Sequence, residues 1–270
     1  MTAAEAALDR AARALSGGGV VAFTGAGISA ESGIPTFRDP GGLWGRFDPG
    51  EFGTWEGLMD LATRKPDALA DFLSEFRRVF AAARPGPAHR ALATLEGSGL
   101  LDAVITQNVD GLHHDAGMRR IIELHGSFRR QVCLACGHRE TVTREEVLEG
   151  LARAIHGLRS TFVTSPASLL PRCTRCDGPA RLDFVAFGED VHDFPEAQRV
   201  ARGSRTMLVV GTSGEVFPTA DLPVRAAEAG ALVIEVAGGP SHVRSDIHLA
   251  GLAGEILPRL VDRALSGADS

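Results

Sequence analysis

The sequence predicts an α/β fold: a doubly wound, Rossmann-like parallel sheet with a second, smaller module beside it. Short, continuous apolar runs rich in β-branched residues recur along the chain, as expected of strands buried on both faces. Stretches with helical periodicity lie between these runs, and this alternation is typical of a parallel sheet. Two stretches interrupt the alternation, which indicates that they leave the sheet and form the second module.

Five segments are expected to be the strands of the sheet. Four are continuous apolar runs, and the segment "RIIEL" is a weaker candidate. In chain order the expected strands are Val20–Phe23, Leu101–Thr106, Arg120–Leu124, Thr206–Gly211 and Ala231–Val236.

Helical stretches are expected between and around these strands. The N-terminal "MTAAEAALDRAARALSGG" has apolar residues at helical spacing and ends in glycines, which predicts a surface helix rather than a secretory signal. Helical periodicity also marks Ala220–Gly230, and "HLAGLAGEILPRLVDRAL" (His248–Leu265) is expected to close the chain as a helix.

The two interrupting stretches predict the domain organisation. Gly45–Ala88 reads as helical, and Gln131–Leu182 holds all four cysteines. We therefore expect residues 1–44, 89–130 and 183–270 to form the Rossmann-like domain. Residues 45–88 are expected to be a helical insertion, and residues 131–182 a cysteine-bearing insertion.

Charge and composition exclude several classes of partner. The 270-residue chain has 28 basic and 34 acidic residues and a net charge of -6, which argues against direct nucleic-acid binding. No apolar run approaches the roughly 20 residues that cross a bilayer, so we expect no membrane association. With no export signal, we expect a cytoplasmic monomer whose four cysteines do not form disulfides.

The cysteines form two matched pairs, Cys133-x-x-Cys136 and Cys173-x-x-Cys176, separated by 36 residues. Each pair lets two thiolates reach one ion, and together they supply the tetrahedral set of four sulfurs that zinc favours. Because four thiolates leave no open coordination position, this zinc is expected to be structural. One amphipathic helix, Thr141–Leu158, is expected to fill the gap. The alternative is four buried or redox-active cysteines.

A glycine turn follows the first expected strand. Gly25–Ala30 fits the G-x-G-x-x-A variant of the dinucleotide fingerprint, in which glycines let backbone N–H groups approach a pyrophosphate. Alone, this pattern also fits a structural tight turn. Downstream, Gly33 and Pro35 stop any helix within two turns. The chain is then expected to present an aromatic, an arginine and an acid as a loop over the ligand: Phe37, Arg38 and Asp39.

Polar residues also follow the second and third strands. Gln107, Asn108 and Asp110 come directly after Leu101–Thr106, at the carboxyl end of a strand, where doubly wound sheets place their sites. His125, in "ELHGSF", follows the next strand and should reach the same edge. An imidazole that titrates near pH 6.5 suits proton removal from a sugar hydroxyl. The neighbouring His113 and His114 are read as structural histidines.

Taken together, these motifs resemble the sirtuins, a family of NAD-dependent protein-lysine deacylases. The resemblance spans roughly residues 20 to 220, and its motifs occur in family order. They are "GAGISAESGIPTFRD", "TQNVDGLHHDAG", "LHGS", the two CxxC pairs, "FGE" (Phe187–Glu189) and "GTSGEVFP" (Gly211–Pro218).

The resemblance implies that NAD and an acyl-lysine meet in a cleft between a Rossmann domain and a zinc and helical module. It implies a catalytic set of His125, Asn108, Asp110 and Arg38, with His125 as the general base. Phe37 would shield the ribose once nicotinamide leaves. The residues it assigns to NAD are Gly25, Ala26, Gly27, Ile28, Ser29, Ala30, Thr36, Phe37, Arg38, Asp39, Trp44, Gln107, Asn108, Asp110, Gly211, Thr212 and Ser213.

The resemblance also implies how the protein substrate binds. Two segments would clamp the acyl-lysine peptide between them as an added strand, with His125 beneath it. The residues assigned to the substrate are His125, Phe187, Gly188, Glu189, Gly214, Glu215, Val216 and Phe217.

In the family mechanism, the acyl oxygen attacks the ribose C1′ and expels nicotinamide, which gives an alkylimidate. The 2′-hydroxyl, deprotonated with the help of the histidine, then takes over the acyl group. The products are free lysine, nicotinamide and O-acyl-ADP-ribose.

The sequence departs from the family pattern at two places. Many sirtuins carry an asparagine after the "ALVIEV" strand, where this chain has Ala237, so NAD is expected to bind more weakly or through backbone groups. Family members that remove succinyl or malonyl groups use a Tyr-x-x-Arg pair, where this chain has Leu73 and Phe76. Because a carboxylate would be buried unpaired there, we expect a preference for acetyl or longer neutral acyl groups.

Three other functions compete with the deacylase. The runner-up is mono-ADP-ribosyl transfer from the same NAD-cleaving site. A module that binds NAD, ADP-ribose or acyl-lysine without turnover is disfavoured, because His125, Asn108, Asp110 and Arg38 are all present. A hydride-transferring dehydrogenase has no use for the zinc pairs or for the loop at residues 33–39.

Overall fold

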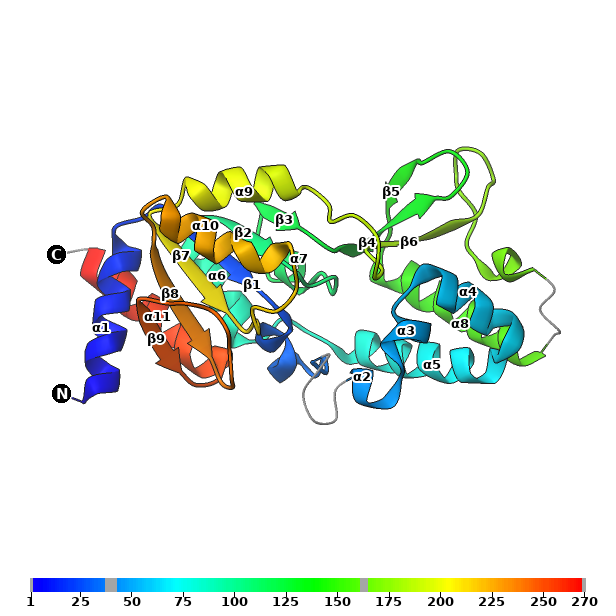
Figure 1. The fold of residues 1–270 in the computed structure, drawn as a ribbon, viewed down its shortest axis with the longest axis horizontal. Coiled ribbons are helices and arrows are strands. Elements are labelled where there is room, and N and C mark those ends of the chain that lie inside the picture. The colour runs from blue at the N-terminus through cyan, green and yellow to red at the C-terminus, as the bar shows by residue number, and fades with distance from the viewer. Residues whose placement is uncertain (1, 37–42, 161–164, 269–270) are drawn as a thin grey trace.

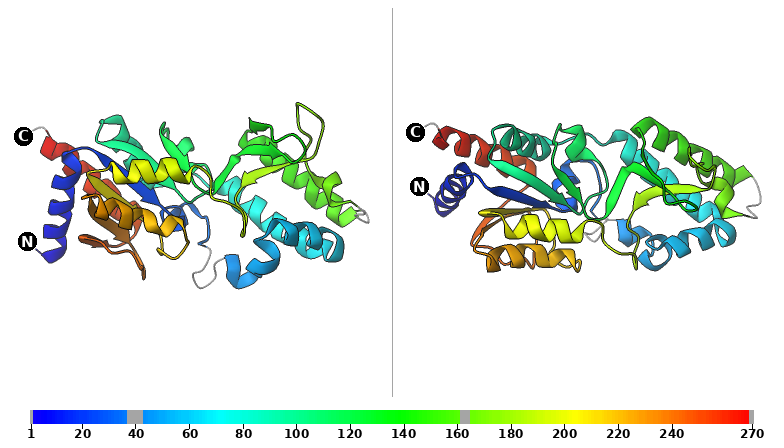
Figure 2. Two further views of the ribbon diagram at one scale, coloured as in Figure 1. Left: turned by 45° about the horizontal axis from the view of Figure 1, so that its top comes forward. Right: turned by 90° about the horizontal axis from the view of Figure 1, so that it is seen from above.

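Two sheets organise the chain, and they lie in separate parts of an elongated molecule (Figures 1 and 2). The computed structural model describes residues 2–36, 43–160 and 165–268. A six-stranded parallel sheet has the order β3-β2-β1-β7-β8-β9. Its strands are β1 (Val20–Thr24), β2 (Leu101–Thr106), β3 (Ile121–Glu123), β7 (Thr206–Val210), β8 (Leu232–Ala237) and β9 (Ile247–Ala250).

The parallel sheet confirms the predicted α/β class, including all five expected strands. Helices cover both of its faces, as the view from above shows (Figure 2). The helices α1 (Ala3–Ser16), α6 (Pro87–Gly97) and α11 (Ala253–Ala268) pack on one face, and α9 (Phe194–Arg202) and α10 (Leu222–Glu228) on the other. Each fully buried leucine or phenylalanine in these two layers contributes about 1.5–3 kcal/mol of stability.

The closing helix begins later than predicted. His248–Ala250 belong to β9, and α11 starts only at Ala253. Burial alternates along β9, with Ile247 and Leu249 inside and their neighbours outside, which is the period of a strand that packs on one face. Pairing with β8 overrides the helical pattern that the sequence suggests at this point.

The smaller part contains an antiparallel sheet and a set of helices. The sheet has the order β5-β4-β6, with β4 at its centre. Its strands are β4 (Gly126–Cys133), β5 (Arg139–Thr141) and β6 (Ala180–Phe184). The helices are α2 (Leu43–Arg46), α3 (Pro49–Phe52), α4 (Trp55–Arg64), α5 (Pro66–Ala82) and α8 (Arg144–Ser160), and α5 packs along α8.

Several elements bear on the predicted insertions. The helix expected at Thr141–Leu158 is α8, which starts at Arg144 because Thr141 ends β5. The elements α6, β4 and β6 each cross one of the predicted domain borders, at residues 88, 130 and 182, so the exact division of the chain stays a prediction. Across the three ranges that the structure describes, no helix combines the length and apolar character needed to cross a bilayer.

Candidate active site

The parallel sheet has one topological switch point, between β1 and β7. From β1 the chain runs outward through β2 and β3, and β7, β8 and β9 extend the sheet in the other direction. In open α/β sheets, ligands bind outside the carboxyl ends of the strands at this point. Two loops meet there, the turn that begins at Gly25 after β1 and the turn that begins at Gly211 after β7.

The glycines of the first turn are required by this close approach. A Cβ on Gly27 would lie 2.7 Å from the Cα of Gly211, and one on Gly25 would lie 2.8 Å from the Gly211 oxygen. The N–H of Gly27 donates to that same oxygen at 2.8 Å. The predicted phosphate turn therefore lies at the switch point, packed directly against the turn at Gly211. It continues as two short 3-10 turns (26–28 and 30–32) rather than a long helix.

Behind the turn, three buried side chains form a hydrogen-bond network. Asn108 donates from Nδ2 to the Gly25 oxygen at 3.0 Å and to Ser29 Oγ at 3.3 Å. Ser29 Oγ in turn donates to Asp110 Oδ2 at 2.8 Å. Asn108 and Asp110 are each 8% exposed and Ser29 is 1% exposed. The network fixes the loop after β2 against the loop after β1, so three residues assigned to NAD are brought together.

Asp110 lies in an environment that disfavours its charged form. Burial raises the pKa of Asp110 above its usual value, while hydrogen bonds from the Leu112 N–H and from Ser29 oppose the rise. Its other oxygen, Oδ1, accepts from the Leu112 N–H at 2.8 Å, at the start of α7 (Leu112–Asp115). Both carboxyl oxygens therefore have a fixed donor, which sets the plane of the group.

His125 lies between β3 and β4, with one ring nitrogen held by the chain. Nδ1 lies 2.9 Å from the main-chain oxygen of Gln107. Because a carbonyl only accepts, Nδ1 carries the proton in the neutral ring and Nε2 is left as the base. Burial lowers the pKa of His125, the Gln107 hydrogen bond opposes this, and nearby His192 lowers it further. The ring is therefore kept neutral, as a general base must be.

The side chain of Gln107 forms hydrogen bonds between the loop after β2 and the segment after β7. Its Nε2 donates to Thr212 Oγ1 at 2.9 Å, and its Oε1 accepts from Thr219 Oγ1 at 3.2 Å. Since the same residue's main chain holds His125, Gln107 links the carboxyl ends of β2 and β7 to the histidine.

One member of the buried network was not found by sequence reasoning. His89, on α6, is fully buried, and its Nε2 lies 3.4 Å from Ser29 Oγ. Its Nδ1 accepts from the Gly86 N–H at 3.2 Å, so Nε2 carries the proton and points at Ser29. In the sequence, His89 is a lone histidine on a helix, without a distinguishing pattern. His113, read as structural, is buried with Nε2 3.0 Å from Thr24 Oγ1.

The structure describes only part of the loop that is predicted to lie over the ligand. Phe37, Arg38 and Asp39 lie outside the described residues, so their predicted roles stay predictions. Thr36 is half-buried at the end of the described segment. Trp44 packs at 5.8 Å, ring centre to ring centre, against Phe187.

The two segments assigned to the substrate each expose a large aromatic side chain. Phe187, which follows β6, is 50% exposed, and Phe217, which follows β7, is 70% exposed. Glu189 is occupied within its own segment, because it accepts from Arg181 at 2.7 Å and from the Ala186 N–H at 2.9 Å. The exposed Glu215 lies 3.3 Å from His242 Nε2.

The four cysteines converge at the far end of the small sheet. The sulfur atoms of Cys133, Cys136, Cys173 and Cys176 all lie within 4.8 Å of one another. The Sγ atoms of Cys133 and Cys176 are 3.5 Å apart, and those of Cys136 and Cys173 are 3.9 Å apart. Four sulfurs around one zinc ion, each bonded at about 2.3 Å, lie about 3.8 Å apart.

Backbone groups support the same conclusion about the cysteines. The N–H groups of Ala135 and Cys136 both donate to Cys133 Sγ at 3.4 Å, and the N–H of Arg175 donates to Cys173 Sγ at 3.4 Å. Such donors stabilise thiolates, and they lower the pKa of the Cys133 thiol to about 6. The donor set therefore fits a structural zinc ion, as predicted.

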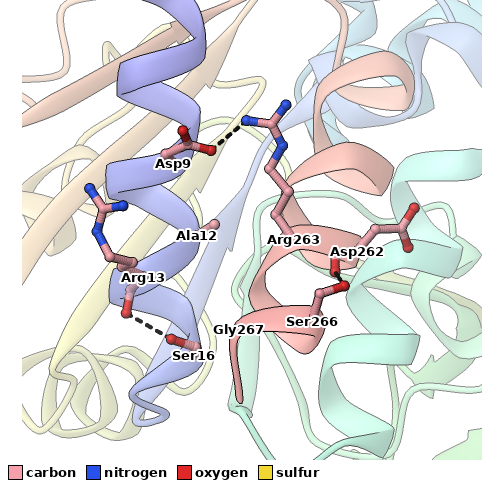
Figure 3. A pocket seen from close by; sticks show the side chains of 8 residues that line it. All are labelled: Asp9, Ala12, Arg13, Ser16, Asp262, Arg263, Ser266 and Gly267. Carbon is pink, nitrogen blue, oxygen red and sulfur yellow. Dashed lines mark hydrogen bonds and ion pairs between the residues drawn. The ribbon is translucent and has the colours of Figure 1, made fainter. Parts of the chain in front are cut away.

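Two cavities lie away from this edge of the sheet. One, of about 390 Å³, lies between α1 and α11 and is lined by both signs of charge, with Arg263 Nη1 bonded to Asp9 at 2.5 Å (Figure 3). It lies beside the chain termini, whereas the polar network lies at the strands' carboxyl ends. The other, of about 340 Å³, lies between α5 and α8.

These features place the chain among α/β proteins that have a dinucleotide-type turn at the switch point, a half-buried histidine at the same edge and a four-cysteine module that fits structural zinc. Comparison with known proteins identifies the family. Residues 25–218 match the model of the Sir2 family, and the chain belongs to that family.

Three similar proteins illustrate the relationship. A curated protein of Desulfosudis oleivorans named "NAD-dependent protein deacylase" is 41% identical over 261 residues, 95% of each chain. The solved structure "Crystal structure of a Sir2 homolog-NAD complex" has a TM-score of 0.76 and 31% identity, covering 96% of this chain and 94% of that one. "The structure of Sir2Af2 bound to a myristoylated histone peptide" has a TM-score of 0.73 and 32% identity, covering 98% and 99%.

Proposed function

We propose that this protein is an NAD-dependent protein-lysine deacylase, which transfers the acyl group to ADP-ribose and releases nicotinamide. The observation that carries the proposal is the fixed tautomer of His125: Nδ1 is held by the Gln107 oxygen, which leaves Nε2 as the base. Its Sir2-family relatives bear the corresponding name, and the matched structures include an NAD complex.

The residues of the chain divide the work between binding and proton transfer. The two glycine turns, at Gly25 and Gly211, lie at the switch point of the sheet, where we expect the pyrophosphate to bind. Asn108 and Asp110, locked by Ser29, suit the nicotinamide end. His125 Nε2 takes the proton of the ribose hydroxyl when that oxygen attacks the acyl carbon. Bound NAD would supply the C1′–nicotinamide bond, which breaks as the acyl oxygen of the substrate bonds to C1′ and nicotinamide leaves.

The substrate is proposed to be an acyl-lysine in a protein segment that binds as an added strand between the segments at Phe187 and Gly214–Phe217. Each of the two segments exposes one large aromatic side chain, Phe187 or Phe217, and these offer apolar surface to a bound peptide. We place the protein in the cytoplasm, because cysteines that bind zinc must stay reduced, as they do in a reducing compartment. The catalytic and contact residues outside the described network, Arg38 foremost, are proposed on the family pattern alone.

One assay tests the proposal. The protein is incubated with NAD and an acetyl-lysine peptide, and O-acetyl-ADP-ribose is sought by mass spectrometry, with His125→Ala as the control. We expect one O-acetyl-ADP-ribose and one nicotinamide per lysine deacetylated. Nicotinamide release with ADP-ribose attached to protein would favour the transferase, and no NAD consumption would favour a binding module.

A further inference from the structure

Strand β4 carries an irregularity on the side that faces β6. Ser127 pairs with Asp183, but the next residue along β6, Leu182, pairs with Gln131. Phe128, Arg129 and Arg130 therefore have no partner across the ladder with β6. Bulges of this kind re-aim side chains and are frequent beside active sites.

The first two residues of the bulge contact the large domain. The N–H of Phe128 donates at 2.8 Å to the oxygen of Val109, the residue between Asn108 and Asp110. Arg129 donates from Nη1 to Asp115 Oδ1 on α7 at 2.7 Å. These two contacts connect the small sheet to the loop after β2, which carries the buried network, and to α7.

The third residue, Arg130, joins the two sheets. Its Nη1 lies 2.5 Å from Glu123 Oε2, at the end of β3, and its Nε lies 3.2 Å from Asp183 Oδ2, on β6. The Glu123 side chain is 6% exposed and that of Asp183 is 4% exposed. These pairs are shielded from water, so solvent screens them far less than it screens a surface ion pair.

His125 lies close to the two strands that Arg130 connects, β3 and β6. Only Leu124 and His125 separate β3 from β4, so the histidine is part of the connection between the sheets. Its main-chain oxygen accepts from the Val185 N–H at 2.8 Å, just after β6. At the next residue, Gly126, a Cβ would lie 1.9 Å from the Asp183 oxygen, so only a glycine lets β6 pair this closely with the connection.

The direction of the His125 ring therefore depends on where β6 lies relative to β3. Arg130 is bonded to one acid on each of these strands. Glu123 has a second partner, His114 Nε2 at 3.2 Å, so removal of Arg130 does not leave that buried carboxylate alone. Loss of the Arg130 side chain should therefore weaken the connection between β3 and β6 near His125 more than it lowers the stability of the whole domain.

We propose that Arg130 is a positioning residue of the reaction, which acts by holding β3 and β6 in the relative position that aims His125 at the ribose hydroxyl. The inference rests on the proposed deacylase function, and it concerns only the step that uses His125. Breakage of the C1′–nicotinamide bond does not use this base, so that step should be far less sensitive to Arg130.

The test separates the two steps. Exchange of labelled nicotinamide into NAD, with the acetyl-lysine peptide present, reports bond breakage, and O-acetyl-ADP-ribose formation reports the step that needs His125. For Arg130→Gln we expect acyl transfer to fall at least about tenfold, while exchange and the KM for peptide change less than about threefold.

The matched control is Arg139→Gln. Arg139, on β5, donates to the same Asp183 oxygen at 3.3 Å, so its substitution removes an ion pair with the same acid. We expect Arg139→Gln to keep the wild-type ratio of acyl transfer to exchange, and Arg130→Lys to restore part of the loss by keeping one ion pair.

The inference would be overturned if Arg130→Gln and Arg139→Gln had the same ratio of acyl transfer to nicotinamide exchange. It would also be overturned if Arg130→Gln changed only the KM for peptide. If Arg130→Gln fails to fold by circular dichroism, Arg130→Lys carries the same test, because lysine keeps the charge without the fork that spans both acids. A wild-type protein that gives neither exchange nor acyl transfer would overturn the proposed function, and the inference with it. If the wild-type protein gives both exchange and acyl transfer, the Arg130 variants test the inference separately from the proposed function.

Discussion

The Nδ1 atom of His125 lies 2.9 Å from the main-chain oxygen of Gln107, the residue directly before Asn108. This contact joins the end of β3 to the loop after β2, so the proposed base is held by the same loop that carries Asn108 and Asp110. It also fixes the tautomer of the ring. The chemistry proposed for the site follows from this contact more than from the presence of a histidine.

The pH dependence of turnover should follow the pKa of His125. Burial lowers that pKa below 6.5, so the neutral base persists to a lower pH than in a free histidine. Activity should therefore fall with decreasing pH with a midpoint below 6.5. The measurement is kcat/KM for deacetylation from pH 5 to 8. The residual rate of His125→Ala, expected to be about 10²–10⁴-fold lower, should lack this limb. A midpoint above 6.5 would contradict the assignment.

The stability of the fold should depend on His89. Burial lowers the pKa of His89 to about 4, so between pH 6.5 and 4 the unfolded chain binds a proton that the folded chain does not. The free energy of unfolding should therefore decrease as the pH falls through this window, by about 3 kcal/mol from this residue. Urea unfolding of wild type and His89→Gln at several pH values measures the difference. Parallel pH profiles would show that His89 has no such role.

The contact between the Gly25 and Gly211 turns should not tolerate a methyl group. In Gly27→Ala the added carbon would meet the Cα of Gly211 at 2.7 Å, so the two turns must separate. We expect a loss of about 1–3 kcal/mol in the free energy of unfolding and weaker NAD binding by calorimetry. Gly97→Ala, at the end of α6, adds the same methyl where no atom lies within 4 Å, and should lower neither, because alanine is the better helix former. Equal behaviour of the two variants would refute the argument.

Removal of one thiolate should lower both the zinc content and the stability of the protein. Cys173→Ser is expected to lower the zinc content of the purified protein and to lower Tm by about 5 °C or more, because binding at a structural site contributes to folding. Elemental analysis and calorimetry measure the two effects. Leu134→Ser, an exposed position between Cys133 and Cys136, is the control and should leave both unchanged. An unaltered Tm after metal loss would mean that the cysteines have another purpose.

We predict the acyl selectivity from Leu73 and Phe76, which stand where the resemblance implies a Tyr-x-x-Arg pair in family members that remove succinyl or malonyl groups. Phe76 stacks on Phe80 and meets Phe128 edge-on at 4.8 Å, and Leu73 packs in the same apolar cluster. A buried carboxylate would find no cation from these two side chains. We expect kcat/KM for a succinyl-lysine peptide to be at least about 100-fold below that for the acetyl peptide. Comparable rates would disprove the predicted preference for neutral chains.

The class of the fold, the four cysteines of the zinc module and most of the residues at one edge of the sheet could be predicted from the amino-acid sequence. These are local signals: a buried strand is a short apolar run, a thiolate pair is two cysteines at fixed spacing, and a turn at a strand end is read from its glycines. Because parallel strands end at the same edge, Gly25, Gln107, His125 and Gly211 could be placed together before any contact was known.

The tertiary structure alone decided the features that depend on partners far away in the chain. Residues 247–250 form β9 because β8 lies beside them, although their sequence continues a helical pattern. His89 joins the site through Ser29, 60 residues away, and the bulge at Phe128–Arg130 arises from pairing with β6. These features could not be placed from the sequence, because each depends on a neighbour that the fold supplies from another part of the chain.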